Sequence, residues 1–165
     1  MESIILIGMP GAGKSTIGVI LAKAAGLRFC DTDLLLQQRE KKLLQQVIDQ
    51  RGIAYFKQCE EQCILAEEFR RTVVATGGSV VYSQRIMEHL AKFGVTVFLE
   101  VPLRELERRV ENFSSRGVIG EGGLAQIYEE RMPLYRRYAQ ITVCCAEKGA
   151  EQIVSEILKR AGMKQ

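Results

Sequence analysis

The chain has 165 residues, of which 47% are hydrophobic and 26% are charged, which is typical of one globular domain and excludes a disordered or fibrous protein. The net charge of +3 comes from 23 basic and 20 acidic residues, an excess too small and too scattered to indicate a nucleic-acid-binding protein. A site that receives anions would suit this charge, but an ordinary solvated surface explains it equally well.

The first predicted strand, residues 4–7, is an apolar run that leads directly into the segment GMPGAGKST at residues 8–16. This segment matches the phosphate-binding pattern G-x-x-x-x-G-K-[ST], the Walker A motif, in full. Apolar residues then recur at helical spacing, which predicts a helix over 14–25 that ends at Gly26. A glycine-rich turn could match the pattern by chance, but the strand, loop and helix together favour nucleotide binding.

Each part of the motif has a physical reason. Gly8, Gly11 and Gly13 allow backbone turns that a Cβ would block, so that N–H groups and the helix N-terminus face a phosphate. Lys14 would reach the β- and γ-phosphates of ATP, and the Ser15 hydroxyl would be a ligand of Mg²⁺. The expected nucleotide-binding set is Gly11, Ala12, Gly13, Lys14, Ser15 and Thr16.

A short second strand over 27–30 delivers Asp31-Thr32-Asp33 at its carboxyl end, where open α/β sheets bind their ligands. On an extended segment, Asp31 and Asp33 would point in similar directions, toward Lys14 and Ser15. One would hold Mg²⁺ through water, and the other would accept a hydrogen bond from an acceptor hydroxyl and act as its base. The alternative is simple N-capping of the next helix by Asp33.

Residues 34–71 are polar and helix-rich, with an interruption near 49–52, and we expect this insertion to lie over the mouth of the sheet. A third strand over 72–75 runs into Thr76-Gly77-Gly78-Ser79, whose glycine pair permits close approach of the backbone to a ligand. Ser83 is expected to cap a helix that extends to about Lys92.

A fourth strand is predicted over 95–99, followed by a helix with Pro102 in its first turn and an outer face of Arg104, Arg108 and Arg109. Residues 112–123 contain four glycines and predict a mobile loop. A helix from about 124, a fifth strand over 141–144 and a last helix ending at Gly162 complete the chain. This alternation predicts a three-layer α/β fold with a parallel sheet, right-handed crossovers and helices on both faces.

The five cysteines, Cys30, Cys59, Cys63, Cys144 and Cys145, form no C-x-x-C pair. Small core residues in a reducing cytoplasm are favoured over disulfides or metal ligands. His89, the only histidine, falls in a predicted surface helix, so a histidine base or metal cluster is not expected. Neither a signal peptide nor a membrane span is expected, because no charged-then-apolar leader or long apolar run is present.

The ordered set of motifs resembles the shikimate kinase family over nearly the whole chain. The set consists of the phosphate loop, Asp31-Thr32-Asp33, the helix of Phe56 and Glu60, Gly77-Gly78, and Arg131-Met132-Pro133-Leu134-Tyr135. The resemblance implies one P-loop NTPase domain over 1–165, similar to nucleoside monophosphate kinases, with sheet order 2-3-1-4-5. It also implies that 34–71 binds the substrate, that 112–123 is the lid, and that the enzyme is a cytoplasmic monomer.

The resemblance further implies a role for each matching position. Asp31 would help to organise Mg²⁺, while Asp33 would contact the shikimate hydroxyls. Gly77 and Gly78 would line the substrate, and Arg131 would bind its carboxylate. A lid arginine would close on the ATP phosphates, for which Arg116 is the basic candidate, and Arg109 would pack along the adenine.

Three positions depart from the family pattern. Lys57 stands where the family has an arginine as a second cation for the substrate carboxylate, Ser79 replaces a third glycine, and the lid reads SSRGV at 114–118. Lysine keeps the charge but loses the bidentate fork. The hypothesis is an ATP-dependent kinase of a small hydroxy acid, with shikimate the leading acceptor. Open alternatives are another metabolite or nucleoside monophosphate kinase, and a nucleotide-binding protein without catalysis.

Overall fold

The structure is a computed structural model that describes residues 3–111 and 123–163. Its five strands are β1 (Ser3–Ile7), β2 (Arg28–Asp31), β3 (Thr72–Ala75), β4 (Gly94–Glu100) and β5 (Ile141–Cys144). The helices in the same ranges are α1 (Lys14–Ala25), α2 (Thr32–Glu40), α3 (Leu44–Leu65), α4 (Gln84–Ala91), α5 (Leu103–Glu111), α6 (Gly123–Tyr138) and α7 (Ala150–Arg160), with the 3₁₀ turn η1 (Val80–Tyr82).

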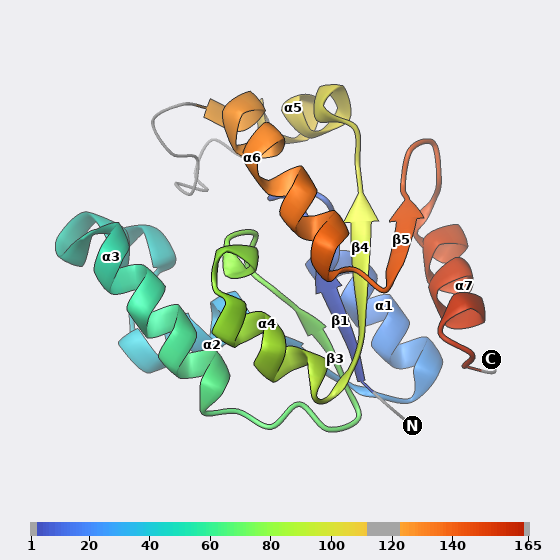
Figure 1. Ribbon diagram of the computed structural model, residues 1–165, viewed down its shortest axis with the longest axis horizontal. Helices are drawn as coiled ribbons and strands as arrows, with labels where there is room; N and C mark the ends of the chain where they lie inside the picture. Colours follow the sequence, from blue (N-terminus) through green and yellow to red (C-terminus); the bar gives the residue numbers. More distant parts are fainter. Residues whose placement is uncertain (1–2, 112–122, 164–165) are drawn as a thin grey trace.

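The strands form one parallel sheet in the order β2-β3-β1-β4-β5, which confirms the predicted topology. β1 is central and fully buried because it pairs with β3 on one side and β4 on the other. Figure 1 shows α4 and α6 on one face of the sheet and α1 and α7 on the other. Right-handed crossovers account for this split, since the chain moves in opposite directions from β1 to β2 and from β3 to β4.

The predicted helix ends are confirmed where a specific residue determines them. α1 ends at Gly26, which adopts the left-handed conformation at φ 64°. Ser83 caps α4 by accepting a hydrogen bond from the N–H of Ile86 at 3.3 Å. The interruption predicted near 49–52 is a kink at Gly52, whose φ of 85° is not helical.

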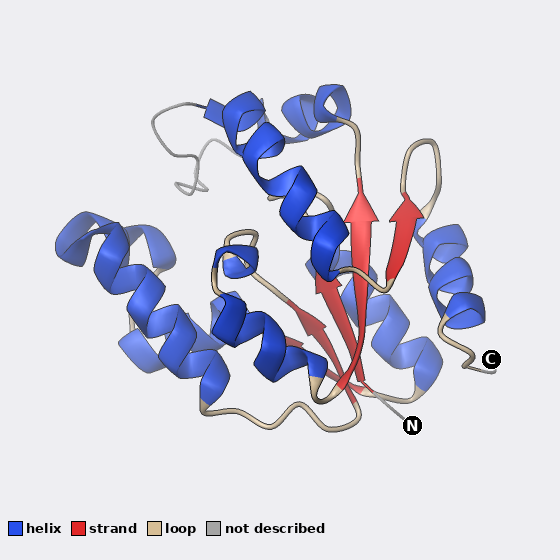
Figure 2. Cartoon of the chain, in the orientation of Figure 1, coloured by secondary structure: helices blue, strands red, loops and turns tan. Residues whose placement is uncertain are grey.

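α2 and α3 carry a small core of their own beside the main one. Leu36 of α2 packs with four buried residues of α3, namely Val47, Phe56, Cys59 and Cys63. The pair stands beside the rest of the domain in Figure 2, next to α4. None of the helices in the described ranges is long and apolar enough to cross a lipid bilayer.

The cap of α2 is Asp31 and not Asp33, the residue named in the capping alternative, because β2 extends to Asp31 and the helix already begins at Thr32. Two predictions about side chains were wrong. Cys144 is exposed because it ends an edge strand, although Cys59, Cys63 and Cys145 are buried as predicted. Arg109 does not lie on the outer face of α5, since its Nη1 donates a hydrogen bond to the carbonyl of Gly11 at 2.9 Å.

β4 approaches β1 so closely at Gly94 that no side chain fits there. A Cβ on Gly94 would lie 1.8 Å from the carbonyl oxygen of its register partner Ser3. We therefore expect Gly94→Ala to lower the free energy of unfolding by about 3 kcal/mol, because backbone atoms of the central strand must shift.

Urea denaturation of the variant and the wild type measures this loss. Gly149→Ala is the control, since its Cβ would meet only Gln152 at 3.8 Å, and should cost less than about 1 kcal/mol. Equal losses for the two variants would contradict the backbone clash.

Candidate active site

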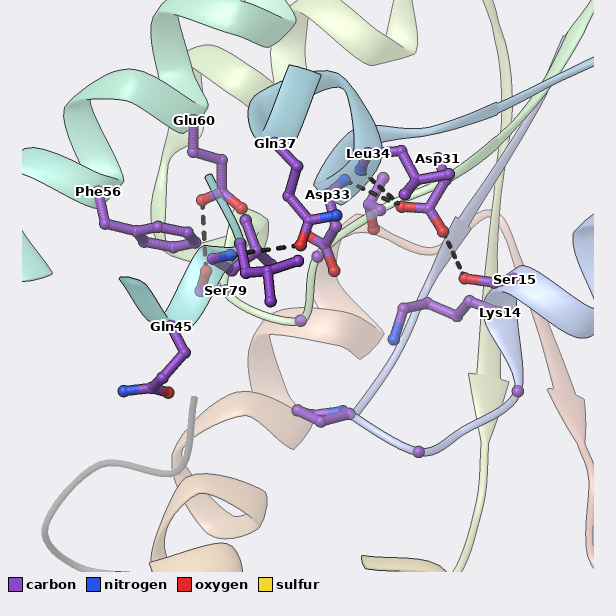
Figure 3. Close-up of a pocket in the computed structure, with 18 of the residues that line it drawn as sticks. Lys14, Ser15, Asp31, Asp33, Leu34, Gln37, Gln45, Phe56, Glu60 and Ser79 are labelled. Carbon is purple, nitrogen blue, oxygen red and sulfur yellow. Dashed lines mark hydrogen bonds between the residues drawn. The ribbon is translucent and has the colours of Figure 1, made fainter. Parts of the chain in front are cut away.

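A cavity of about 600 Å³ opens at the carboxyl ends of β1, β2 and β3. Figure 3 shows that the helix pair α2 and α3 faces the phosphate loop across this cavity. Its lining comprises Pro10, Gly11, Gly13, Lys14, Ser15, Thr16, Asp31, Asp33, Leu34, Gln37, Leu43, Leu44, Gln45, Phe56, Glu60, Thr76, Gly77, Gly78 and Ser79. The predicted nucleotide loop and most of the predicted acceptor residues therefore share one cavity.

The glycines of the phosphate loop adopt the backbone that the sequence predicted. Gly8, Gly11 and Gly13 have φ values of 150°, 81° and 91°, and Gly13 is the N-cap of α1. Lys14 is buried, and its Nζ donates hydrogen bonds to the carbonyls of Gly8 at 2.7 Å and Met9 at 2.8 Å. The loop thus holds an ammonium group and a helix N-terminus at one point, an arrangement suited to a polyphosphate.

Ser15 and Asp31 meet at the edge of this loop. The hydroxyl of Ser15 donates a hydrogen bond to Oδ2 of Asp31 at 2.6 Å (Figure 3). Oδ1 of Asp31 accepts hydrogen bonds from the N–H groups of Asp33 at 2.9 Å and Leu34 at 3.4 Å, which fixes the carboxylate. A hydroxyl and a carboxylate oxygen in contact are hard oxygen donors, which fits Mg²⁺ bound beside phosphates.

Asp33 points away from that pair, toward Glu60 and the loop after β3. A Cβ on Gly77 would lie 2.8 Å from Oε1 of Glu60 and 3.0 Å from Oδ1 of Asp33, so both carboxyl groups flank the same backbone carbon. Ser79 donates a hydrogen bond to Oε2 of Glu60 at 3.3 Å. Burial, reinforced by the charge of Asp33, raises the pKa of Glu60 to about 7, against the opposing effects of Ser79, Arg131 and Lys57.

Arg131 packs against the second glycine of the same loop. A Cβ on Gly78 would lie 2.8 Å from its Nη1 and 3.0 Å from Cδ of Pro10, so a side chain here would displace the guanidinium group. Arg131 is only 5% exposed, and among the described residues its Nη1 has no hydrogen-bond partner. A buried guanidinium nitrogen without a partner, beside a wall of the cavity, is prepared to bind an anion.

Lys57 lies farther from the cavity, on the exposed face of α3. Its Nζ lies 5.4 Å from the ring centroid of Tyr82, and Cζ of Arg131 lies 5.2 Å from the same centroid. The structure therefore brings the two predicted carboxylate-binding cations together around Tyr82, beside the cavity and outside its lining. Arg116 and residues 112–122 of the lid predicted over 112–123 lie outside the described residues.

Comparison with known proteins assigns the family. The family model described as shikimate kinase matches residues 10–161. A shikimate kinase of Sulfurihydrogenibium sp. is 34% identical over 163 residues, which cover 97% of this chain and 98% of that protein. The chain belongs to the shikimate kinase family.

Solved shikimate kinases have the same fold as this chain. The enzyme from Acinetobacter baumannii, solved in complex with shikimate, superposes with a TM-score of 0.89 at 26% identity, covering 97% of this chain and 92% of that one. The enzyme from Aquifex aeolicus superposes with a TM-score of 0.80 at 31% identity, covering 95% and 94%. The resemblance recognised from the ordered motifs is thereby confirmed.

Two residues that hold the glycine loop of this shikimate kinase family member in place, Thr32 and Tyr135, were not predicted as parts of the site. The hydroxyl of Thr32 accepts a hydrogen bond from the N–H of Gly77 at 3.1 Å and so ties α2 to the glycine loop. The hydroxyl of Tyr135 donates to the carbonyl of Gly78 at 2.7 Å. The sequence did contain a signal for both, since Thr32 and Tyr135 belong to the motifs that carried the resemblance.

The raised pKa of Glu60 makes stability depend on pH. A carboxyl group with an ordinary pKa of 4.5 that titrates near 7 in the folded protein holds its proton more tightly when folded. The free energy of unfolding should therefore fall as pH rises from about 4.5 to about 7. Glu60→Gln removes this titration. The free energy of unfolding of the variant, relative to that of the wild type, should therefore increase by about 3 kcal/mol between pH 4.5 and pH 8.

Urea denaturation at the two pH values measures this gain. Glu68→Gln, on the exposed surface, is the control and should show no gain. A difference between Glu60→Gln and the wild type that does not change with pH would contradict a raised pKa of Glu60.

Proposed function

We propose that the protein transfers the γ-phosphoryl group of ATP to shikimate and forms shikimate 3-phosphate, a step of aromatic amino-acid biosynthesis. One observation supports this most directly. A single cavity joins the phosphate loop of Lys14 to Asp33. Nη1 of buried Arg131, which has no hydrogen-bond partner within 3–111 and 123–163, lies against the cavity wall at Gly78. A hydroxyl group and a carboxylate on one small molecule would satisfy Asp33 and Arg131 together.

The donor half would bind ATP through the backbone of Gly11–Thr16 and the ammonium group of Lys14. Ser15 and Asp31 would hold Mg²⁺, since their oxygens already meet at 2.6 Å. When bound, Mg²⁺ would neutralise negative charge that develops on the transferred phosphoryl group. Arg109 hydrogen-bonds the carbonyl of Gly11, from which it would reach along the adenine side of the nucleotide.

The acceptor half would orient the hydroxyl toward the γ-phosphate. Asp33 would accept the hydroxyl proton as the oxygen attacks the γ-phosphorus, while the bond to the β,γ-bridging oxygen breaks and ADP leaves. The substrate carboxylate would lie at Arg131 and Lys57. The backbone of Gly77, Gly78 and Ser79 would line the substrate opposite the apolar ring of Phe56.

The remaining predictions concern domain organisation. We propose that residues 34–71 form the substrate-binding insertion, since they supply Leu34, Phe56 and Glu60 to the cavity. We also propose that 112–123 is the lid and that Arg116 closes on the ATP phosphates. We further propose that the protein acts as a monomer.

A coupled ADP-release assay with shikimate, homoserine, gluconate and related hydroxy acids tests the function. We expect turnover with shikimate that requires Mg²⁺, and little ADP release with the other acceptors. Turnover of a different hydroxy acid would reject shikimate but keep the reaction class. Calorimetric binding of ATP without product from any acceptor would reject catalysis.

Asp33→Asn should lower kcat at least 100-fold, because the amide cannot accept the hydroxyl proton. The Kd of ATP, measured by calorimetry, should stay within about twofold, since Asp33 lies on the acceptor side of the cavity. Asp49→Asn on exposed α3 is the matched control and should behave like the wild type. Equal loss of turnover and ATP affinity in Asp33→Asn would move Asp33 into the metal site.

A further inference from the structure

Tyr82 stands at an unusual position for a large aromatic residue. It ends η1, three residues after Ser79 of the Gly77–Ser79 loop, and it is 44% exposed. The two preceding residues, Val80 and Val81, are buried in the core. The ring therefore contributes little to the core and instead covers the outside of the acceptor site.

Three elements meet on this ring. Lys57 comes from α3, Arg131 from α6, and their charged groups lie 5.4 Å and 5.2 Å from the ring centroid. Both distances are within the range of a cation–π interaction. The hydroxyl group fixes the ring, since it donates to Oε2 of Glu130 at 3.1 Å and accepts from Nε of Arg131 at 3.4 Å.

This arrangement addresses two physical problems of the site. Two cations directed at one carboxylate repel each other, and the negative face of an aromatic ring offsets part of that repulsion. Lysine also has a flexible four-carbon stem and no planar fork, so an unanchored Lys57 would lose much side-chain entropy on binding a carboxylate. Contact with the ring restricts both side chains before the carboxylate arrives, which lowers that entropic cost.

We propose that Tyr82 is a positioning residue for acceptor recognition, which holds Lys57 and Arg131 together as a binding site for the carboxylate of the substrate. This inference rests on the proposed function. Tyr82 acts through the two cations, which its ring contacts directly. The hydroxyl group serves mainly to fix the ring through Glu130.

Steady-state kinetics of Tyr82→Leu and Tyr82→Phe test the proposal. Tyr82→Leu should raise the KM for shikimate about fivefold to tenfold, which corresponds to the loss of two exposed cation–π contacts. Its kcat, its KM for ATP and its melting temperature should stay close to those of the wild type. Tyr82→Phe is the matched control, because it keeps the ring, and its KM for shikimate should stay within about twofold.

A double-mutant cycle tests whether Tyr82 affects the KM for shikimate through Lys57. Lys57→Met should raise the KM for shikimate by itself, and adding Tyr82→Leu should raise it by less than the product of the two single effects. The methyl ester of shikimate supplies a second readout, because it lacks the charge that the cations recognise. Tyr82→Leu should leave the KM for the ester unchanged.

The outcomes separate this inference from the proposed function. If the wild type turns over shikimate and Tyr82→Leu has the same KM for shikimate, the positioning role is overturned and the proposed function stands. An equal rise of the KM for shikimate in Tyr82→Leu and Tyr82→Phe also overturns the positioning role. So does a Tyr82→Leu variant with a lower melting temperature and raised KM values for both shikimate and ATP. If the wild type does not turn over shikimate, the proposed function fails.

In that last case, the chemical shifts of the Lys57 Hε and Arg131 Hε protons decide the positioning. Ring-current shifts that disappear in Tyr82→Leu support it. Shifts that do not change in the variant overturn it.

Discussion

The site depends on one constraint, which is that parallel strands end at the same edge of the sheet. β1 lies between β3 and β4, and β3 lies between β1 and β2, so the segments after β1, β2 and β3 must converge. These segments begin at Gly8, Thr32 and Thr76, and each carries part of the chemistry. The phosphate loop, the aspartate pair and the glycine loop therefore meet in space although more than sixty residues separate the first from the last.

Within that edge, the two glycines after β3 determine how closely charged groups can pack. Gly77 admits the carboxyl groups of Asp33 and Glu60, and Gly78 admits Arg131. Two carboxylates side by side in a buried site would repel, and the raised pKa of Glu60 reflects a preference for its neutral form. Below pH 7, a protonated Glu60 places no second negative charge beside Asp33.

Much of this arrangement followed from local sequence, and the parts that did not follow depend on distant contacts. α1 and β3 were predicted with the right bounds, because Gly26 ends one and a β-branched run defines the other. That Asp31 caps α2 could not be predicted, because whether β2 ends before or after Asp31 depends on its pairing with Ala75. The role of Tyr82 could not be predicted, since its contact with Arg131 spans 49 positions along the chain.

The two halves of the proposed site differ in composition, and this difference explains how Lys57 and Ser79 can depart from the family pattern. The donor half consists mostly of backbone N–H groups and a helix N-terminus, which tolerate different side chains as long as the glycine conformations remain. The acceptor half consists of side chains from α2, α3, η1 and α6, so a change at one position alters the geometry of its neighbours. Lys57 and Ser79 both fall in that half, where Tyr82 and Glu60 contact them. A lysine anchored by a ring and a serine bonded to a buried carboxyl group can thus stand where the family has arginine and glycine, while the phosphate loop keeps its full motif.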